Sequence, residues 1–262
     1  RMNILDKIIA HKKEELEVRK MMVREAELME SKYYNRTCLS MKQNLLQTGA
    51  TGIIAEFKRK SPSKGFINQH AEVAAIAQAY TKFGASGISV LTDHEFFGGS
   101  TEDLVIAREN EVPILRKEFI IDPYQVLASK AMGADVVLLI AACLSPAEVK
   151  QIGGFAKQIG LEVLLEIHTE AELDHVCDEV DMVGINNRNL KTFEVDINHS
   201  LKISEKIPAD KVKIAESGIN NVETIGLFKE AGFKGFLMGE NFMKEKDPGE
   251  AFRKFAELLK QL

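Results

Sequence analysis

Short apolar runs alternate with longer amphipathic segments from about residue 52 to the end of the chain. This alternation predicts repeated βα units around a parallel sheet. The predicted strands cover residues 52–57, 87–91, 113–116, 134–140, 161–165, 181–185, 211–215 and 235–238. Because eight such units close naturally into a ring, we predict an α/β protein with a (β/α)8 TIM barrel.

Glycines precede several of the predicted strands. Gly84, Gly133, Gly160 and Gly232 stand where a helix ends and a residue able to adopt positive φ is favoured. An open, doubly wound sheet would more often carry a GxGxxG turn after its first strand, and KRK follows Phe57 instead. Both observations favour the barrel.

The first 48 residues have a different pattern, rich in Glu, Lys, Met and Leu. Ile4, Ile8, Leu16 and Val18 recur at roughly helical spacing among charged residues. We therefore predict one domain over residues 1–262, with residues 1–48 as an N-terminal helical extension packed on the barrel. Because two glutamates follow Lys12 and Lys13 at once, these lysines are interpreted as part of a solvated helix face.

Polar residues collect where the predicted strands end, which is where (β/α)8 barrels build their active sites. Alternation along a strand points Glu56 and Lys58 to the same side and Phe57 to the surrounding helices. The other strand-end residues are Arg116, Lys117, Glu118, Glu166, Asn186, Arg188, Glu216 and Ser217. A lysine among glutamates stays charged and can donate a proton, so the set predicts an acid/base site centred on Lys117 and Glu166.

A second signal lies after the last two predicted strands. Ser217 and Gly218 follow the seventh strand, and Gly239 with a short helix over residues 240–244 follows the eighth. Free backbone N–H groups in these loops are the recurrent phosphate cradle of the fold, although Glu240 is an unfavourable neighbour for an anion. The long basic loop over residues 58–69 suits either a mobile lid over an anionic substrate or a solvated surface loop.

Composition and charge narrow the classes of protein. A net charge of −5 argues against a nucleic-acid surface, and no uninterrupted apolar stretch reaches the roughly 18 residues of a membrane span. The three cysteines are far apart and the six histidines form no metal-binding motif, so we expect a reducing, cytoplasmic environment and no metal ion. The expected partner is a small phosphorylated molecule, bound by a monomer or weak homo-oligomer.

Motifs along the whole chain resemble those of the indole-3-glycerol phosphate synthase family. They are EFKRKSPS at 56–63, SVLTD at 89–93, PILRKEFIID at 113–122, LLE at 164–166, GINNRNL at 184–190, AESGI at 215–219 and LMGE at 237–240. The chain departs from the family pattern modestly, with Asn187 and Asn241 where Ser is frequent and Asn189 where Asp is frequent.

The resemblance implies a (β/α)8 barrel that needs no cofactor and converts 1-(2-carboxyphenylamino)-1-deoxyribulose 5-phosphate to indole-3-glycerol phosphate, carbon dioxide and water. It implies Lys117 as the acid of ring closure and Glu166 as its base or charge partner. Glu56 and Lys58 become a second acid/base and substrate-binding pair, and the pair that serves dehydration stays open. The other implied residues are Asn186, Arg188 and Glu216, which hold the substrate and fix the lysines, Ser61 at the anionic site, Phe97, Leu138 and Leu190 around the aromatic ring, and Lys58, Ser217, Gly218, Gly239 and Glu240 at the phosphate.

Three alternatives compete with this interpretation. Lys117 could form a Schiff base as in an aldolase, although neighbouring glutamates would raise its pKa and disfavour that chemistry. A sugar-phosphate isomerase could use acid/base residues on the same fold, and fold alone does not separate the two. A barrel that binds a phosphorylated ligand without catalysis is the third.

Overall fold

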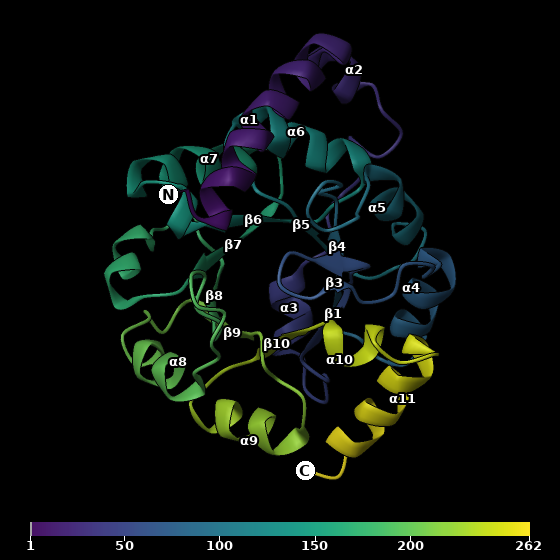
Figure 1. Cartoon of the computed structure of the whole chain (residues 1–262), viewed down its shortest axis with the longest axis vertical. Coiled ribbons are helices and arrows are strands. Elements are labelled where there is room, and N and C mark those ends of the chain that lie inside the picture. Colours follow the sequence, from purple (N-terminus) through teal and green to yellow (C-terminus); the bar gives the residue numbers. More distant parts are fainter. Residues whose placement is uncertain (1) are drawn as a thin grey trace.

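The computed structural model describes residues 2–262, and within them eight parallel strands form a closed barrel encircled by helices (Figure 1). The strands are β1 (Ile53–Phe57), β4 (Gly87–Leu91), β5 (Ile114–Lys117), β6 (Val136–Ile140), β7 (Glu162–Ile167), β8 (Met182–Asn186), β9 (Val212–Glu216) and β10 (Gly235–Met238). Each strand pairs with the next, and β10 returns to pair with β1. The predicted (β/α)8 barrel is confirmed, with every strand within two residues of its predicted bounds.

Helices follow the strands as the periodicity predicts. They are α4 (Val73–Lys82), α5 (Thr101–Ala107), α6 (Pro123–Met132), α7 (Pro146–Gln158), α8 (Ile197–Ser204), α9 (Val222–Glu230), α10 (Glu240–Met243) and α11 (Pro248–Leu259), with a 3₁₀ turn η1 (Ala141–Cys143) before α7. The segment after β7 differs, because it forms only the 3₁₀ helix η2 (Glu170–His175). Residues 168–181 form the shortest connection between consecutive strands of the barrel.

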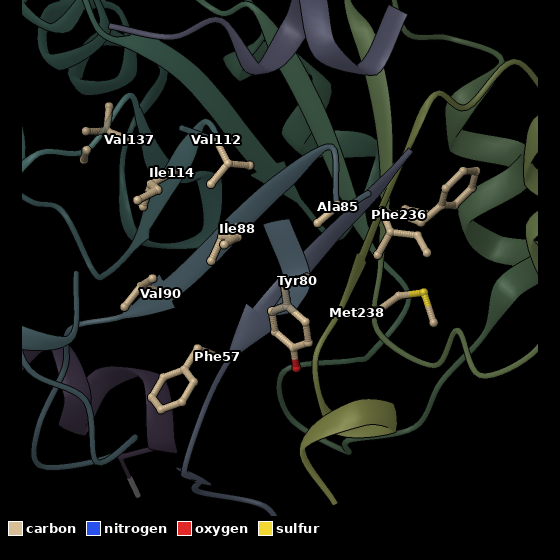
Figure 2. Close-up of a cluster of buried hydrophobic side chains, with 14 of the residues drawn as sticks. Phe57, Tyr80, Ala85, Ile88, Val90, Val112, Ile114, Val137, Phe236 and Met238 are labelled. Atoms are coloured by element: carbon tan, nitrogen blue, oxygen red, sulfur yellow. The ribbon is translucent and has the colours of Figure 1, made fainter. Parts of the chain in front are cut away.

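Alternation along the strands divides the core into two layers. Ile54, Leu115 and Leu164 point into the barrel, whereas Phe57, Val137 and Phe236 point outward against the helices. Figure 2 shows part of this outer layer, where the Tyr80 side chain of α4 lies beside strand residues. The same alternation therefore aims every second residue at a strand end into the mouth of the barrel.

Local signals set the helix ends. Asp122 and Gln125 form a capping box at the start of α6, with Pro123 at its first position. At the other end, Gly133 takes φ of 106°, which a residue with a side chain rarely adopts. Positive φ is likewise found at the other three glycines that the sequence marks, Gly84, Gly160 and Gly232.

The N-terminal helices reach both ends of the barrel. Helix α1 (Ile4–Met22) lies against the carboxyl ends of the strands, and α2 (Glu25–Met29) packs beside α6. Helix α3 (Met41–Leu46) lies at the opposite end, where Met41 and Leu45 join the apolar interior of the barrel. Glu162, at the start of β7, accepts hydrogen bonds from Met41 N at 2.6 Å and Lys42 N at 3.2 Å and fixes that end of α3.

The interpretation of Lys12 as a solvated residue is wrong. Its side chain is only 3% exposed, and it occupies the buried stripe of α1 between Ile8 and Leu16. Val18, which the apolar pattern placed on that stripe, is 55% exposed. Positions 8, 12 and 16 share one helix face, so Lys12 is buried by geometry and is tolerated there because carboxylates surround it.

The basic loop after β1 folds into a short antiparallel hairpin of β2 (Lys60–Ser61) and β3 (Gly65–Phe66). Arg59 anchors its base, because the guanidinium pairs with Asp103 and donates to the Gly98 carbonyl at 3.3 Å. A lid motion of residues 58–69 stays a prediction. Within residues 2–262, no helix is long and apolar enough to cross a membrane.

Asp135 lies at the end of the barrel opposite the mouth, and its substitution tests how much the contacts at that end contribute to stability. Its carboxylate is fully buried and accepts bonds from Leu39 N at 2.7 Å and Ile114 N at 2.8 Å, while pairing with Arg36 and Arg108. Asp135→Asn leaves the guanidinium of Arg108 without its buried counter-charge, so we expect a loss of about 3 kcal/mol in unfolding free energy. Urea denaturation measures this loss.

The matched control is Asp210→Asn, which alters a side chain that is 74% exposed. We expect this control to retain wild-type stability within about 0.5 kcal/mol, and both variants to keep wild-type kcat/KM. A loss below about 1 kcal/mol for Asp135→Asn would contradict the role given to this ion pair.

Candidate active site

A cavity of about 370 Å³ opens at the carboxyl ends of the strands. All of the site residues that the family resemblance implies line it. They are Glu56, Lys58, Ser61, Phe97, Lys117, Leu138, Glu166, Asn186, Arg188, Leu190, Glu216, Ser217, Gly218, Gly239 and Glu240. The structure therefore brings together residues from distant parts of the chain at one site.

Lys117 ends β5 and points into the cavity beside Glu56 of β1. Its ammonium donates to Glu56 Oε2 at 3.2 Å, and Ser89 Oγ donates to the same oxygen at 2.7 Å. The Lys58 ammonium lies 3.5 Å from the other oxygen, Glu56 Oε1. One buried carboxylate thus holds two lysines in fixed positions.

These contacts determine the charges of the groups. Burial alone would lower the pKa of Lys117, but Glu56, Glu216 and Glu166 outweigh it and the pKa is raised. Burial would likewise raise the pKa of Glu56, but Lys117, Lys58 and the Ser89 hydroxyl lower it. Lys117 is therefore an ammonium and Glu56 a carboxylate at neutral pH.

Glu166 and Glu216 form the opposite side of the charged cluster. Burial and the adjacent Glu166 carboxylate raise the pKa of Glu216 well above its ordinary value. Although burial acts against ionisation of Glu166 too, the neighbouring Glu216, His168 and Lys117 side chains outweigh it and lower the pKa of Glu166. The two side chains therefore differ in proton affinity: Glu166 ionises first and Glu216 keeps its proton to higher pH, so the pair places a base beside an acid.

Two neighbouring residues, His168 and Gly184, lie against the pair of Glu166 and Glu216. His168 Nε2 lies 3.6 Å from Glu166 Oε2, and His168 does not line the cavity. Gly184 of β8 leaves space for Glu216, since a Cβ atom there would lie 2.6 Å from Glu216 Oε1. Gly184 is thus a site residue that the sequence analysis did not single out, and its signal was a glycine inside an otherwise apolar strand.

Backbone groups with unusual conformations line the other side of the cavity. Ser217 and Gly218 both have positive φ, of 68° and 71°, and Ser217 is one of two non-glycine residues among 2–262 to do so. Asn187 Nδ2 donates to the Ser217 carbonyl at 2.8 Å and holds this turn. Gly239 precedes α10, and the Glu240 carboxylate that follows lies 3.6 Å from the Lys64 ammonium.

Apolar side chains cover the remaining wall. Phe97, Leu138 and Leu190 were expected there, and Phe119, Ile140 and Phe193 join them. The rings of Phe97 and Phe119 lie 5.9 Å apart at a tilt of 35°. Phe119 could have been found from the sequence, because it stands two residues after Lys117.

Helix α1 adds Ile4, Leu5 and Ile8 to the apolar wall, and the sequence analysis did not place these residues in the site. Nothing in their spacing tells which part of the barrel the helix contacts. Arg116, by contrast, was among the strand-end candidates but points outward, where it donates to the Gln125 carbonyl at 3.0 Å and Ser129 Oγ at 3.1 Å of α6.

The arrangement can perform proton transfer on an anionic, partly aromatic molecule. It combines a charged lysine held by a carboxylate, a base paired with an acid, an apolar wall and a turn rich in available backbone groups. No group of three or more His, Cys, Asp or Glu within residues 2–262 is arranged to hold a metal ion. Fold and site together define a (β/α)8-barrel enzyme of the acid/base class.

Comparison with known proteins gives the family. The family model described as indole-3-glycerol phosphate synthase matches residues 5–255. A protein of that name from Bacteroides thetaiotaomicron is 45% identical over 98% of this chain and 99% of its own length. A protein of the same name from Salinibacter ruber is 42% identical over 95% of this chain and 94% of its own length. The chain belongs to the indole-3-glycerol phosphate synthase family.

Solved structures with low sequence identity share the fold. The 3-hexulose-6-phosphate synthase of Salmonella typhimurium gives a TM-score of 0.63 at 15% identity, over 80% of this chain and 99% of that one. The tryptophan synthase α subunit of Legionella pneumophila gives 0.61 at 14% identity, over 84% and 97% of the two chains. At such identity the likeness concerns the barrel and not the chemistry.

The raised pKa of Glu216 predicts a pH-dependent difference in stability between the wild type and Glu216→Gln. Because folding favours protonated Glu216, its contribution to stability is full below the ordinary carboxyl pKa and is lost as pH rises through the raised value. Glutamine imitates the protonated acid and carries no such loss. From about pH 5 upward, we therefore expect the Tm of Glu216→Gln to rise progressively relative to the wild type in scanning calorimetry.

The matched control is Glu205→Gln on the exposed end of α8, which should track the wild type at every pH. A Tm difference for Glu216→Gln that stays constant across the pH range would show that Glu216 is ionised like an ordinary carboxyl group.

Proposed function

We propose that this chain converts 1-(2-carboxyphenylamino)-1-deoxyribulose 5-phosphate to indole-3-glycerol phosphate, carbon dioxide and water. The observation that carries the proposal is the Lys117 ammonium, held by Glu56 inside a cavity with an apolar wall on one side and the Ser217–Gly218 turn on another. An anionic substrate with an aromatic ring and a phosphate matches these three features, and family membership supports the same reaction.

Ring closure requires a proton donor at the ribulose carbonyl. The aromatic carbon that bears the carboxylate attacks the carbonyl carbon, and Lys117 transfers a proton to the oxygen, which becomes a hydroxyl group. Because the pKa of Lys117 is raised, the ammonium is fully formed before the reaction, and Glu56 neutralises part of its charge. The same raised pKa disfavours the Schiff-base alternative, which needs a neutral amine.

Decarboxylation then restores the aromatic ring. The bond from the ring carbon to the carboxylate breaks, carbon dioxide leaves, and the electron pair returns to the ring. The apolar wall of Phe97, Leu138 and Leu190 suits this step, because it excludes water from the ring to which the electron pair returns.

Dehydration requires an acid and a base. We assign the acid to Lys58, 3.5 Å from Glu56, which protonates the departing hydroxyl group. We assign the base to Glu166, which accepts the proton from the adjoining ring carbon and whose pKa is lowered, whereas that of the adjacent Glu216 is raised. The two pairs thus divide the work between opposite sides of the cavity.

The remaining residues bind the substrate. Asn186 and Arg188 lie on the β8 side, where Asn186 Oδ1 accepts from Arg188 N at 2.9 Å and Arg188 Nη1 donates to Ser63 Oγ at 3.3 Å. With Ser61 they form the proposed site for the anthranilate carboxylate. Ser217, Gly218, Gly239 and the Glu240 backbone N–H, with Lys58 near by, form the proposed phosphate cradle.

Further features of the protein belong to the same proposal. We propose that the chain acts in the cytoplasm as a monomer or weak homo-oligomer, without a cofactor and without binding nucleic acid or a membrane. Its residues 1–262 are proposed to work as one domain with residues 1–48 as an extension.

The direct test is the appearance of indole fluorescence when the purified protein is incubated with the carboxyphenylamino substrate. The chain contains no tryptophan, so the product's indole signal rises over a background without protein indole. A failure to form the product, in a protein shown to be folded by circular dichroism, would remove the proposed reaction.

Lys117→Ala tests the acid of ring closure. We expect kcat to fall by at least about a hundredfold, the usual effect of removing a general acid, in the same fluorescence assay. The matched control is Lys150→Ala on the exposed face of α7, which should keep wild-type turnover. Unchanged kcat in Lys117→Ala would refute the assignment, and a covalent adduct trapped by borohydride in the wild type would favour the Schiff base.

A further inference from the structure

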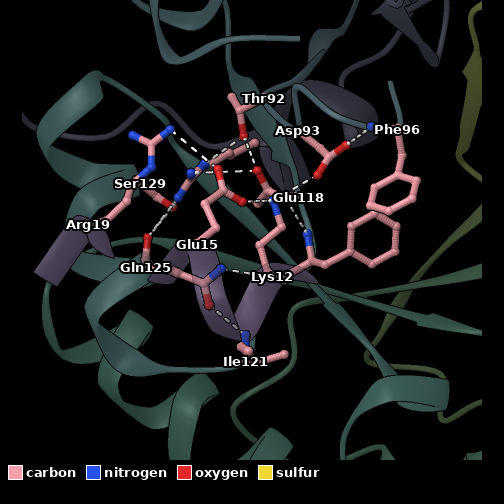
Figure 3. Close-up of polar contacts among 12 residues, drawn as sticks. Lys12, Glu15, Arg19, Thr92, Asp93, Phe96, Glu118, Ile121, Gln125 and Ser129 are labelled. Carbon is pink, nitrogen blue, oxygen red and sulfur yellow. Dashed lines mark hydrogen bonds and ion pairs between the residues drawn. The ribbon is translucent and has the colours of Figure 1, made fainter. Parts of the chain in front are cut away.

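Lys12 is a buried lysine of α1 that lies outside the cavity and that the proposed reaction does not use. Its ammonium lies 2.8 Å from Asp93 Oδ1, 2.9 Å from Glu118 Oε1 and 2.7 Å from Glu15 Oε2 (Figure 3). Asp93 and Glu118 are buried as well, whereas Glu15 is partly exposed. Burial would lower the pKa of Lys12, but Glu118 and Asp93 raise it, so the ammonium keeps its charge.

The two buried partners of Lys12 stand at the ends of adjacent strands. Asp93 follows β4, and Glu118 follows Lys117 directly at the end of β5. Thr92 Oγ1 donates to Glu118 Oε2 at 2.8 Å and accepts from Arg116 Nε at 3.0 Å. These two hydrogen bonds hold the Glu118 carboxylate in place. Lys12 therefore fastens α1 to a part of the barrel rim that is itself held rigidly.

The same two carboxylates hold the backbone of the aromatic wall. Asp93 Oδ2 accepts from Phe96 N at 2.8 Å, and Glu118 Oε1 accepts from Phe119 N at 2.9 Å. Phe119 and the neighbour of Phe96, Phe97, line the cavity with their rings in contact. A shift of either carboxylate would move an aromatic ring of the site.

Helix α1 itself completes that wall. Ile4 and Ile8 lie on the same face as Lys12, at successive spacings of four residues, and both line the cavity with Leu5. Lys12 is one helical turn beyond Ile8, and hydrogen-bonded ion pairs are directional where apolar contacts are not. The position of these apolar side chains over the cavity thus depends on the register that Lys12 sets.

We propose that Lys12 is a positioning residue for the aromatic part of the substrate. By pairing with Asp93 and Glu118 it fixes α1 and the rings of Phe97 and Phe119 in one geometry, so that the apolar wall is formed before the substrate binds. The proposal rests on the proposed function, since the group recognised there is the carboxyphenylamino ring.

The test replaces Lys12 by methionine, which keeps the length and removes the charge. For Lys12→Met we expect KM for the carboxyphenylamino substrate to rise at least about tenfold with kcat changed less than about threefold, because contacts made equally in ground and transition states are lost. Without product, hydrogen exchange of the α1 amides should be faster in Lys12→Met than in the wild type. Added product should slow this exchange in the wild type but not in Lys12→Met. The matched control is Lys13→Met, the next residue on the same helix, which is exposed and should retain wild-type constants.

A purely structural role for Lys12 would lower Tm and leave KM unchanged at temperatures where the variant is folded, and this outcome would overturn the proposal. Loss of Lys12 also leaves the buried carboxylates of Asp93 and Glu118 without their counter-charge. A second variant therefore combines Lys12→Met with Asp93→Asn and Glu118→Gln. It removes the negative charges at positions 93 and 118 and keeps acceptors for Phe96 N and Phe119 N, while Arg116, 3.8 Å from Glu118 Oε2 in the wild type, retains its hydrogen bonds to the Gln125 carbonyl and Ser129. We expect it to fold and to keep the raised KM, and a wild-type KM in this variant would equally refute the proposal.

Product formation by the wild type and by Lys13→Met distinguishes a failure of this inference from a failure of the proposed function. If neither forms the indole product, the reaction is wrong. If both form it and the Lys12 variants bind substrate normally, the reaction stands and the role of Lys12 is wrong.

Discussion

A lysine in a site with little water keeps its charge only if carboxylates lie close to it, and those carboxylates stay ionised only because of the lysine. Glu56, Lys58 and Lys117 satisfy this mutual condition at the mouth of the barrel, and Lys117 also helps to keep Glu166 ionised while the pKa of the adjacent Glu216 is raised. These groups stand on β1, β5, β7 and β9 or, for Lys58, directly after β1. The condition is therefore met only when these strands have come together in the barrel. The chemistry of the site therefore depends on completion of the whole fold.

The barrel and the charged cluster are the parts of the molecule that the sequence predicts best. Strand periodicity leaves one choice for the direction of Glu56, Lys117, Glu166 and Glu216, because each follows an inward-facing residue by two positions. Closure of the barrel then brings them together without further information. The motifs that resemble the family supplied the apolar residues Phe97, Leu138 and Leu190, which periodicity alone would not have selected.

The N-terminal helices were predicted less well, for a physical reason. A helix has several faces that could be buried, and the partner decides which one is. In α1 the choice fell on Ile8, Lys12 and Leu16, and the exposed Val18 shows that apolar character was not the deciding property. Lys12 is compatible with that face only because Asp93 and Glu118, more than 80 residues further along, end their strands beneath it. Short-range patterns do not contain such information.

The contacts of the N-terminal segment with Asp135 and Glu162 also affect the order in which the chain folds. During synthesis residues 1–48 emerge before the barrel strands, yet α3 is capped by Glu162 and the segment before it is held by Asp135, both made much later. This segment must therefore wait, with Met41 and Leu45 uncovered, until more than half of the barrel has been translated. Contacts between residues so distant in the chain are slow to form. The end of the barrel opposite the active site is thus expected to close late in folding, although the residues that close it leave the ribosome before the strands that they cover.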